Sequence, residues 1–250
     1  MINFFRKKRK KLADENKILK YTRYAFGEIV LVVIGILIAL QINTWNNSQI
    51  DKKKEIKYLK AIKLDLLKDI ESTAYNIEFR KEKLLSTQKV IDQINGKKID
   101  DFTELVINIG NTLYVERFQP NNITFNEMVS SGNVNLISND SIKKLLLELD
   151  LLYQKNIFGI EHETFEYQEY LSKPVFKDFD LLAIKQLFLK QKTAEELNIK
   201  QEDLVALMQN KEYLNGCIIS NWTSEEMIVI LENIENKSKK TIEFIINEIK

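Results

Sequence analysis

The chain has 250 residues, of which 44% are hydrophobic and 10% aromatic, enough to bury the core of one ordinary domain and too apolar for a disordered polypeptide. Seven Gly and two Pro leave few turn residues, so we expect an all-α fold rather than a strand-and-turn protein. The chain has a single Cys and a single His, which excludes an internal disulfide, a Cys/His zinc site and a Cys-x-x-Cys pair within one chain.

The net charge of +1 conceals a division along the chain. Residues 1–23 contain nine Lys or Arg and two acidic residues, so this tail carries about +7 and the remainder about −6. Phosphate binding requires clustered positive charge, and we therefore expect no nucleic-acid partner for the mildly acidic main body.

One apolar run predicts a helix that crosses a lipid bilayer. Residues 29–40 read IVLVVIGILIAL, which as a helix spans only about 18 Å. Extending the helix to residues 24–45 reaches the roughly 30 Å of a hydrocarbon core and places Glu28 and Gln41 near its ends. Tyr24 and Trp45 lie where aromatic belts form, so we predict a single transmembrane helix at 24–45.

The basic tail predicts the orientation of this helix. By the positive-inside rule, residues 1–23 form a cytoplasmic tail, and residues 46–250 form a helical extracytoplasmic domain in the periplasm, held by the inner (cytoplasmic) membrane. The alternatives are a cleaved signal peptide and a buried core helix. The long charged region and the absence of an A-x-A-like site after Ala39 disfavour cleavage, so we expect a single-pass signal anchor.

Two features within the predicted span are candidates for function. Gly27, Leu31, Gly35 and Ala39 lie four residues apart on one stripe, where a second helix could approach closely and form a homodimer. Glu28 is an intramembrane acid, which is a functional candidate by its location. The simpler interpretation of Glu28 is an interfacial carboxylate facing Arg23 or a lipid headgroup.

A long helix is predicted to follow the span. Residues 46–95 contain no Gly or Pro, and apolar residues recur with a seven-residue pattern. The positions that a strict coiled coil would make apolar include Lys63, Thr73, Arg80 and Thr87. We therefore favour a helix that packs within its own domain over a dimeric coiled coil next to the membrane.

The remaining elements are predicted from their capping and breaking residues. Asn95-Gly96 ends the long helix, and further helices are expected at 101–115 and 124–129. Asn139 and its neighbours cap a helix that continues towards Leu171, before Pro174. Helices at 181–189 and 201–210 precede a terminal helix that ends near residue 249, with an interruption suggested by a Thr223/Glu226 capping box.

Only one segment resembles a chemical site. Residues 161–169 contain four Glu and the single histidine, His162, four residues before Glu166. Helical di-metal centres need Glu-x-x-His motifs on two helices, so a solvated acidic face is favoured over a metal site. No motif marks a serine nucleophile, and the sequence contains no Gly-rich phosphate loop. We therefore assign no catalytic, cofactor or metal residues and expect neither an enzyme nor a cofactor.

Three blocks give the chain a family resemblance: GEIVLVVIGILIALQINTWN at 27–46, YLKAIKLDLLKDI at 58–70, and ITFNEMVSSGNVNLISNDSIKKLLLELDLLY at 123–153. In these it resembles an uncharacterised, domain-of-unknown-function family of single-pass membrane proteins from Gram-negative bacteria. The resemblance implies a helical extracytoplasmic region and supplies no activity. We expect an envelope interaction or scaffolding module that binds an unknown envelope protein or itself. The alternative is a sensor or relay subunit with a cytoplasmic partner.

Overall fold

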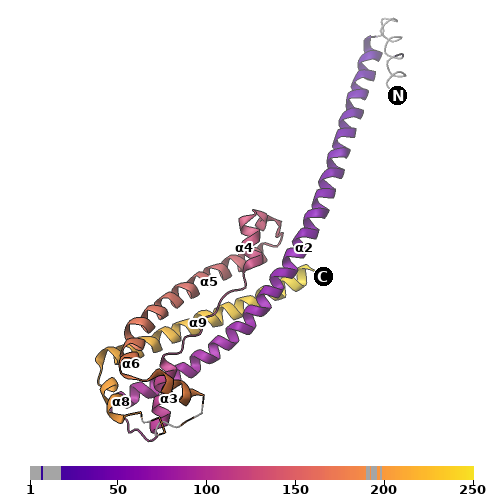
Figure 1. The fold of residues 1–250 in the computed structure, drawn as a ribbon. Helices are drawn as coiled ribbons and strands as arrows, with labels where there is room; N and C mark the ends of the chain where they lie inside the picture. Colours follow the sequence, from indigo (N-terminus) through magenta and orange to yellow (C-terminus); the bar gives the residue numbers. More distant parts are fainter. Residues whose placement is uncertain (1–6, 8–17, 190–191, 193–195, 198) are drawn as a thin grey trace. The chain divides into compact units, whose positions relative to one another are not determined.

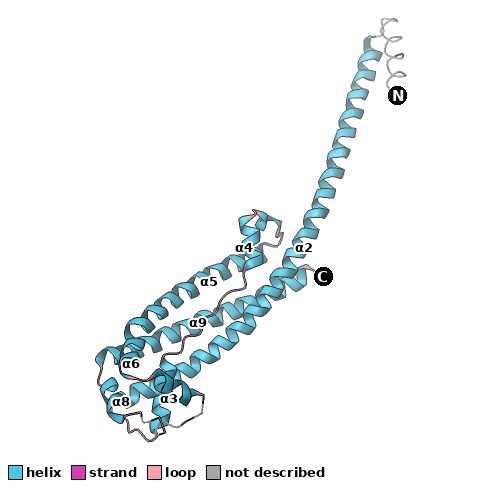
Figure 2. Ribbon diagram, in the orientation of Figure 1, coloured by secondary structure: helices cyan, strands magenta, loops and turns pink. Residues whose placement is uncertain are grey.

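The structure is a computed structural model that describes residues 7, 18–189, 192, 196–197 and 199–250. All regular elements in these residues are helical, which confirms the predicted all-α fold (Figure 2). Contacts between residues divide the chain into two compact units, Met1–Lys57 and Tyr58–Lys250. The predicted tail at 1–23 lies outside the described residues except for Lys7 and residues 18–23.

The first unit contains the beginning of helix α2, which extends over Ile18–Ile94. Within the described residues, α2 is the one helix long and apolar enough to cross a membrane, and it lies near the N-terminus. None of its most apolar window is buried, so the alternative of a buried core helix is disfavoured. A membrane span and a signal helix both fit this exposed apolar surface.

The second unit is built around three long helical segments that lie side by side. They are the part of α2 from Tyr58 to Ile94, α5 at Asp140–Glu166 and α9 at Lys211–Glu248 (Figure 1). One hydrophobic cluster joins them, with Leu66 from α2, Leu149 from α5 and Leu231 from α9 all buried in it. The long helix after the predicted span therefore packs on helices of its own chain.

Short helices enclose a second hydrophobic cluster at one end of this bundle. Buried residues of α3 (Phe102–Thr112), α7 (Leu181–Phe188) and α8 (Gln201–Met208) join Val90 and Cys217 there. Helix α4 (Ile123–Ser130) and the 3₁₀ turn Asn133–Leu136 lie at the opposite end of the bundle (Figure 1). The second unit thus has two apolar clusters, separated along the three long helices.

Local sequence signals account for several helix boundaries. The side chains of Asp101, Asn139, Asp180 and Asn210 accept hydrogen bonds from backbone N–H groups in the first turns of α3, α5, α7 and α9. Gly96, after α2, has a φ of +98°, a left-handed conformation that favours glycine at a helix end. The predicted stop at Asn95-Gly96 and the predicted starts at Asp101 and Asn139 are confirmed.

Three predicted details are wrong. Helix α3 ends at Thr112 rather than near Val115. Helix α9 is continuous from Lys211 to Glu248, because the Thr223 hydroxyl donates to Glu166 instead of capping a new helix. The helix that contains α5 also continues past Pro174, through a π-helical turn at Tyr167–Leu171 and into α6 at Ser172–Asp178.

The π-helical turn explains how this helix accommodates Pro174. Pro174 then lies in the first turn of α6, where a missing N–H removes few helical hydrogen bonds. Gly216 of α9 packs against the same turn: a Cβ at this glycine would lie 2.8 Å from Cβ of Tyr170 and 3.2 Å from its carbonyl carbon. A residue without a side chain is therefore required where α9 crosses the turn.

Candidate functional site

A layer of polar side chains is buried between the two hydrophobic clusters. The buried residues of α2 are apolar at Ile77, charged or polar at Arg80 and Thr87, and apolar again at Val90. Of the four residues that interrupt the seven-residue pattern, Thr73, Arg80 and Thr87 are fully or almost fully buried, and Lys63 is partly exposed. The interruption therefore marks charged and polar groups that face the bundle interior.

The central contact of this layer is an ion pair between α2 and α5. Nη1 and Nη2 of Arg80 each donate to one carboxylate oxygen of Glu163, both at 2.9 Å. Arg80 is 1% exposed and Glu163 is 3% exposed. Nη2 also donates to the backbone oxygen of Glu116 at 3.3 Å. This two-pronged geometry fixes the rotation and the axial position of α5 on α2.

Lys83 brings a second buried cation to the same carboxylate. Its Nζ donates to Glu163 Oε1 at 3.4 Å. Burial, with a contribution from the Arg80 charge, lowers the pKa of Lys83 despite the opposing effect of Glu163. Burial acts in the opposite sense on Glu163, but Arg80 and Lys83 outweigh it and lower the pKa of Glu163. Glu163 is therefore an ionised carboxylate at neutral pH.

Glu166 is the second buried carboxylate, one helical turn further along α5. It is 8% exposed, and its Oε1 accepts a hydrogen bond from the Thr223 hydroxyl of α9 at 2.7 Å. Its Oε2 is buried and accepts no hydrogen bond from the described residues. Burial, reinforced by the charge of Glu163, raises the pKa of Glu166. The pKa of Glu166 is thus raised and that of Lys83 is lowered, so the difference between the two pKa values is smaller than usual.

A smaller buried polar contact joins α2 and α5 within the first hydrophobic cluster. The Tyr153 hydroxyl donates to Asp69, which also accepts from the backbone and side-chain nitrogens of Asn121 at 2.7 and 3.0 Å. Burial raises the pKa of Asp69 in spite of these donors. This contact attaches the loop before α4 to the bundle, and its role is structural.

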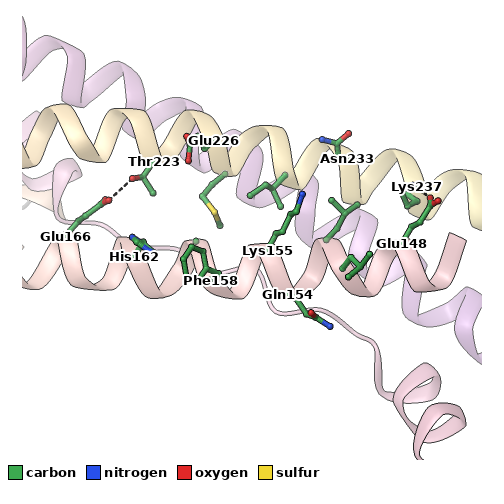
Figure 3. A pocket seen from close by; sticks show the side chains of 15 residues that line it. Glu148, Gln154, Lys155, Phe158, His162, Glu166, Thr223, Glu226, Asn233 and Lys237 are labelled. Atoms are coloured by element: carbon green, nitrogen blue, oxygen red, sulfur yellow. Dashed lines mark hydrogen bonds and ion pairs between the residues drawn. The ribbon is translucent and has the colours of Figure 1, made fainter. Parts of the chain in front are cut away.

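An open groove lies between α5 and α9 on one side of the polar layer (Figure 3). Its volume is about 870 Å³, and its apolar lining includes Leu151, Leu152, Phe158, Met227 and Ile230. The two helices approach closely at Gly159, which has no Cβ to collide with the side chain of Met227. The groove is therefore a shallow apolar channel that follows the two helices.

Polar side chains mark the ends and the middle of the groove. Lys237 of α9 and Glu148 of α5 form an ion pair at one end, and Glu166 and Thr223 meet at the other (Figure 3). Lys155 lies between these ends and forms no hydrogen bond or ion pair with described residues. The groove thus presents both a long apolar surface and an unpaired cation.

The predicted solvated acidic face at 161–169 is only partly correct. Glu161 and His162 are exposed, and the ring centroid of His162 lies 4.5 Å from that of Phe158 at the groove. Glu163 and Glu166 are instead buried against α2 and α9, so these two residues belong to the bundle interior. Among the described residues, no group of three or more His, Cys, Asp or Glu side chains is placed to hold a metal ion.

The small-residue stripe of the predicted span belongs to the first unit. Gly27, Leu31, Gly35 and Ala39 all lie on α2, and each is exposed. A Cβ built at Gly27 or Gly35 would meet nothing within 4 Å. Glu28 is half-buried. The stripe is thus open for a second helix, and pairing through it stays a prediction.

Comparison with known proteins places the chain in a family. A model described as a family of unknown function, DUF6090, matches residues 28–210, nearly three quarters of the chain. The chain belongs to this family. No curated protein and no solved structure matches it. The DUF6090 match includes all but the first four residues of the predicted span, together with α5 and the buried ion pair, whereas the whole of α9, and with it one wall of the groove, lies beyond the matched residues.

The sequence of the DUF6090 chain indicates some of its functional candidates and not others. Arg80 was marked by its place on the seven-residue pattern, but its partner Glu163 lies 83 residues later, among three other Glu. To predict the groove, one must know which faces of α5 and α9 the bundle leaves exposed. Helical periodicity alone does not supply that knowledge.

We expect replacement of Glu163 by Gln to destabilise the DUF6090 chain by about 3–5 kcal/mol, because Arg80 and Lys83 would lose their buried counter-charge. Denaturant unfolding of the full chain in detergent measures this loss. Glu161→Gln removes the same charge at an exposed position and should change stability little. A triple variant, Arg80→Met and Lys83→Met with Glu163→Leu, should recover much of the loss, because it leaves none of these three buried charges without a partner. Wild-type stability of Glu163→Gln would contradict the structural role of the pair.

We expect Glu166→Gln to stabilise the chain at pH 7 and to lose this advantage near pH 4. The raised pKa of Glu166 means that the folded state binds more protons than the unfolded state between the ordinary value of 4.5 and the raised value. Its contribution to stability therefore falls as pH rises through that window. Thermal unfolding at both pH values tests this, with Glu161→Gln as control. An equal effect at both values would contradict it.

Proposed function

We propose that the chain is a membrane-anchored helical interaction module whose second unit binds a protein partner through the α5/α9 groove. The observation that carries this proposal is the groove itself, an apolar channel flanked by exposed large side chains. Phe158 on α5 is 62% exposed and Trp222 on α9 is 67% exposed. Large exposed apolar surfaces on helices are typical of sites that accept a helix or a peptide.

The chemistry of the described residues supports binding rather than catalysis. Arg80, Lys83 and Glu163 are enclosed in the bundle, where no substrate would reach them without unfolding. Burial raises the pKa of Cys217 to about 12, so this thiol is not a nucleophile at neutral pH. The groove combines an apolar lining with charged groups at its ends and in its middle, which suits recognition of the side chains of a protein partner.

We further propose the topology of a single-pass inner-membrane protein from a Gram-negative bacterium, with residues 1–23 in the cytoplasm and the second unit in the periplasm. The positive charge of residues 1–23 and the exposed apolar window of α2 support this arrangement. The bilayer and an envelope protein are then the partners of the chain, and Glu28 would lie at the cytoplasmic interface.

A sensor or relay subunit is the second candidate, and one observation favours it. Helix α2 carries both the candidate span and the buried cations Arg80 and Lys83. A partner that displaced α5 would have to change contacts made by the same helix that enters the membrane. A cytoplasmic partner for the tail would then be required.

We expect alkaline phosphatase fused after Lys250 to be active in cells, and green fluorescent protein fused at the same point to be dark, because the positive tail retains the N-terminus inside. Replacing the nine cations of residues 1–23 by Gln should reduce phosphatase activity. An N-terminal epitope tag should stay on the full-length protein. Loss of that tag from the mature protein would indicate a cleaved signal peptide instead.

We expect a photo-crosslinking amino acid at Phe158 or Trp222 to capture a protein in intact cells, whereas the same residue at Leu85 should not. Leu85 is 67% exposed on α2 and lies away from the groove lining, so it is a matched control. The adduct from Phe158 should disappear when Val229 is changed to Glu and persist with Leu85→Glu. Absence of adducts at both groove positions would overturn the proposed interaction module.

A further inference from the structure

Helices α5 and α9 each carry a second apolar stripe that their own bundle does not cover. On α5, the exposed residues Leu151, Phe158 and Phe165 follow one another at intervals of seven. On α9, the exposed residues Trp222 and Val229 are separated by the same interval. An interval of seven residues is the repeat by which helices pack along one another. The buried faces of the same two helices point into the bundle, so these stripes are additional to the core.

The area of the exposed stripes is close to that of a standard interface. Leu147, Leu151, Phe158, Phe165, Trp222 and Val229 are each at least half exposed. At about 150–250 Å² for a whole aromatic side chain, and somewhat less for an aliphatic one, they present roughly 650 Å² together. This exceeds the roughly 300–600 Å² of the largest apolar patch on a typical monomer. It approaches the roughly 800 Å² that each partner contributes to a standard interface.

The register of α5 and α9 makes this surface self-complementary. The two helices are antiparallel, because Glu148 pairs with Lys237 at one end of the groove and Glu166 with Thr223 at the other. Counting inward from these contacts, Phe158 is level with Val229 and Phe165 with Trp222. Each of the two helices therefore exposes a large apolar side chain at the same two levels.

We propose that a second copy of this chain docks on this surface, with a two-fold axis parallel to the helices. This inference rests on the proposed function of the groove as an interface, and it names the partner. The two-fold places α5 of each copy along α9 of the other. Phe158 then meets Val229 of the second copy, and Phe165 meets Trp222, while the reciprocal pairs form by symmetry.

A pair of polar side chains also fits this symmetry. Glu226 lines the groove and forms no hydrogen bond or ion pair with described residues of its own chain. The level of Glu226 on α9 corresponds to that of His162 on α5, by the same count along the helices. The two-fold brings Glu226 of each copy opposite His162 of the other. Two such pairs would lie between the level of Phe158 and the level of Phe165.

Directed disulfide formation between copies tests the proposed register in native membranes. In a Cys217→Ala background, a chain with Phe158→Cys is co-expressed with a differently tagged chain carrying Val229→Cys. We expect at least a tenfold higher yield of the mixed disulfide than of either symmetric one after mild oxidation. Leu85→Cys with Val229→Cys is the control and should give none. A dominant Phe158–Phe158 disulfide, or no mixed disulfide, would overturn the proposed arrangement.

Oligomeric state provides a second measurement on the same surface. Light scattering of the full chain in detergent should report a dimer, and Phe158→Glu should weaken dimerisation at least tenfold while Leu85→Glu leaves it unchanged. Phe158 is exposed in one copy, so its replacement leaves the core intact. Dimers that persist in Phe158→Glu, for example through Gly35 and Ala39, would refute this interface.

The crosslinking experiment separates failure of this inference from failure of the proposed function. An adduct from Phe158 with twice the mass of the chain, containing only its peptides, supports the second copy as the occupant. An adduct that contains another protein would overturn the second copy and leave the interaction module standing. No adduct at any groove position would overturn both.

Discussion

The ion pair between Arg80 and Glu163 is the constraint on which the second unit depends. Both groups are almost completely buried, so each is tolerated only while the other neutralises it. The two parallel hydrogen bonds allow one axial position of α5 against α2. A shift of α5 by one residue would separate the Arg80 guanidinium from the Glu163 carboxylate. The apolar clusters on either side would accept several registers, because Leu and Ile contacts are not directional. The polar layer therefore selects the register of α5 on α2, and the desolvation of its charged groups lowers the stability of the fold.

This selected register determines what the outside of the bundle presents. With Glu163 directed at α2, and Glu166 at Thr223 on α9, the helix α5 has its rotation fixed at two points. Phe158 and Phe165 then project from the opposite side of α5, where both are exposed. The buried charges and the exposed aromatic residues are consequences of the same helix rotation, so disturbing the ion pair would also displace the groove.

The sequence predicted much of the fold and little of the groove. Asn95-Gly96, Asp101 and Asn139 define helix ends through local hydrogen bonds and backbone conformation, which act over a few residues and can be recognised in a single chain. The Thr223 capping box was wrong because its hydroxyl has a partner on another helix, Glu166, which local patterns do not include. The same limit applies to Arg80: its pattern position predicted an interruption, whereas the compensating carboxylate comes from α5.

An exposed apolar stripe is the hardest feature to infer from one sequence, because it looks the same as a buried one. Helix α5 carries Leu149 on its core face and Phe158 on its outer face, and both are counted as apolar positions. Only the bundle decides which of the two is covered. The proposal of a binding role rests on that distribution of groups. Catalysis places charged and polar groups at an accessible surface, whereas this chain buries Arg80, Lys83 and Glu163 and exposes aromatic rings. Such a surface gains free energy by being covered, and a helical partner is the simplest cover that matches its seven-residue spacing.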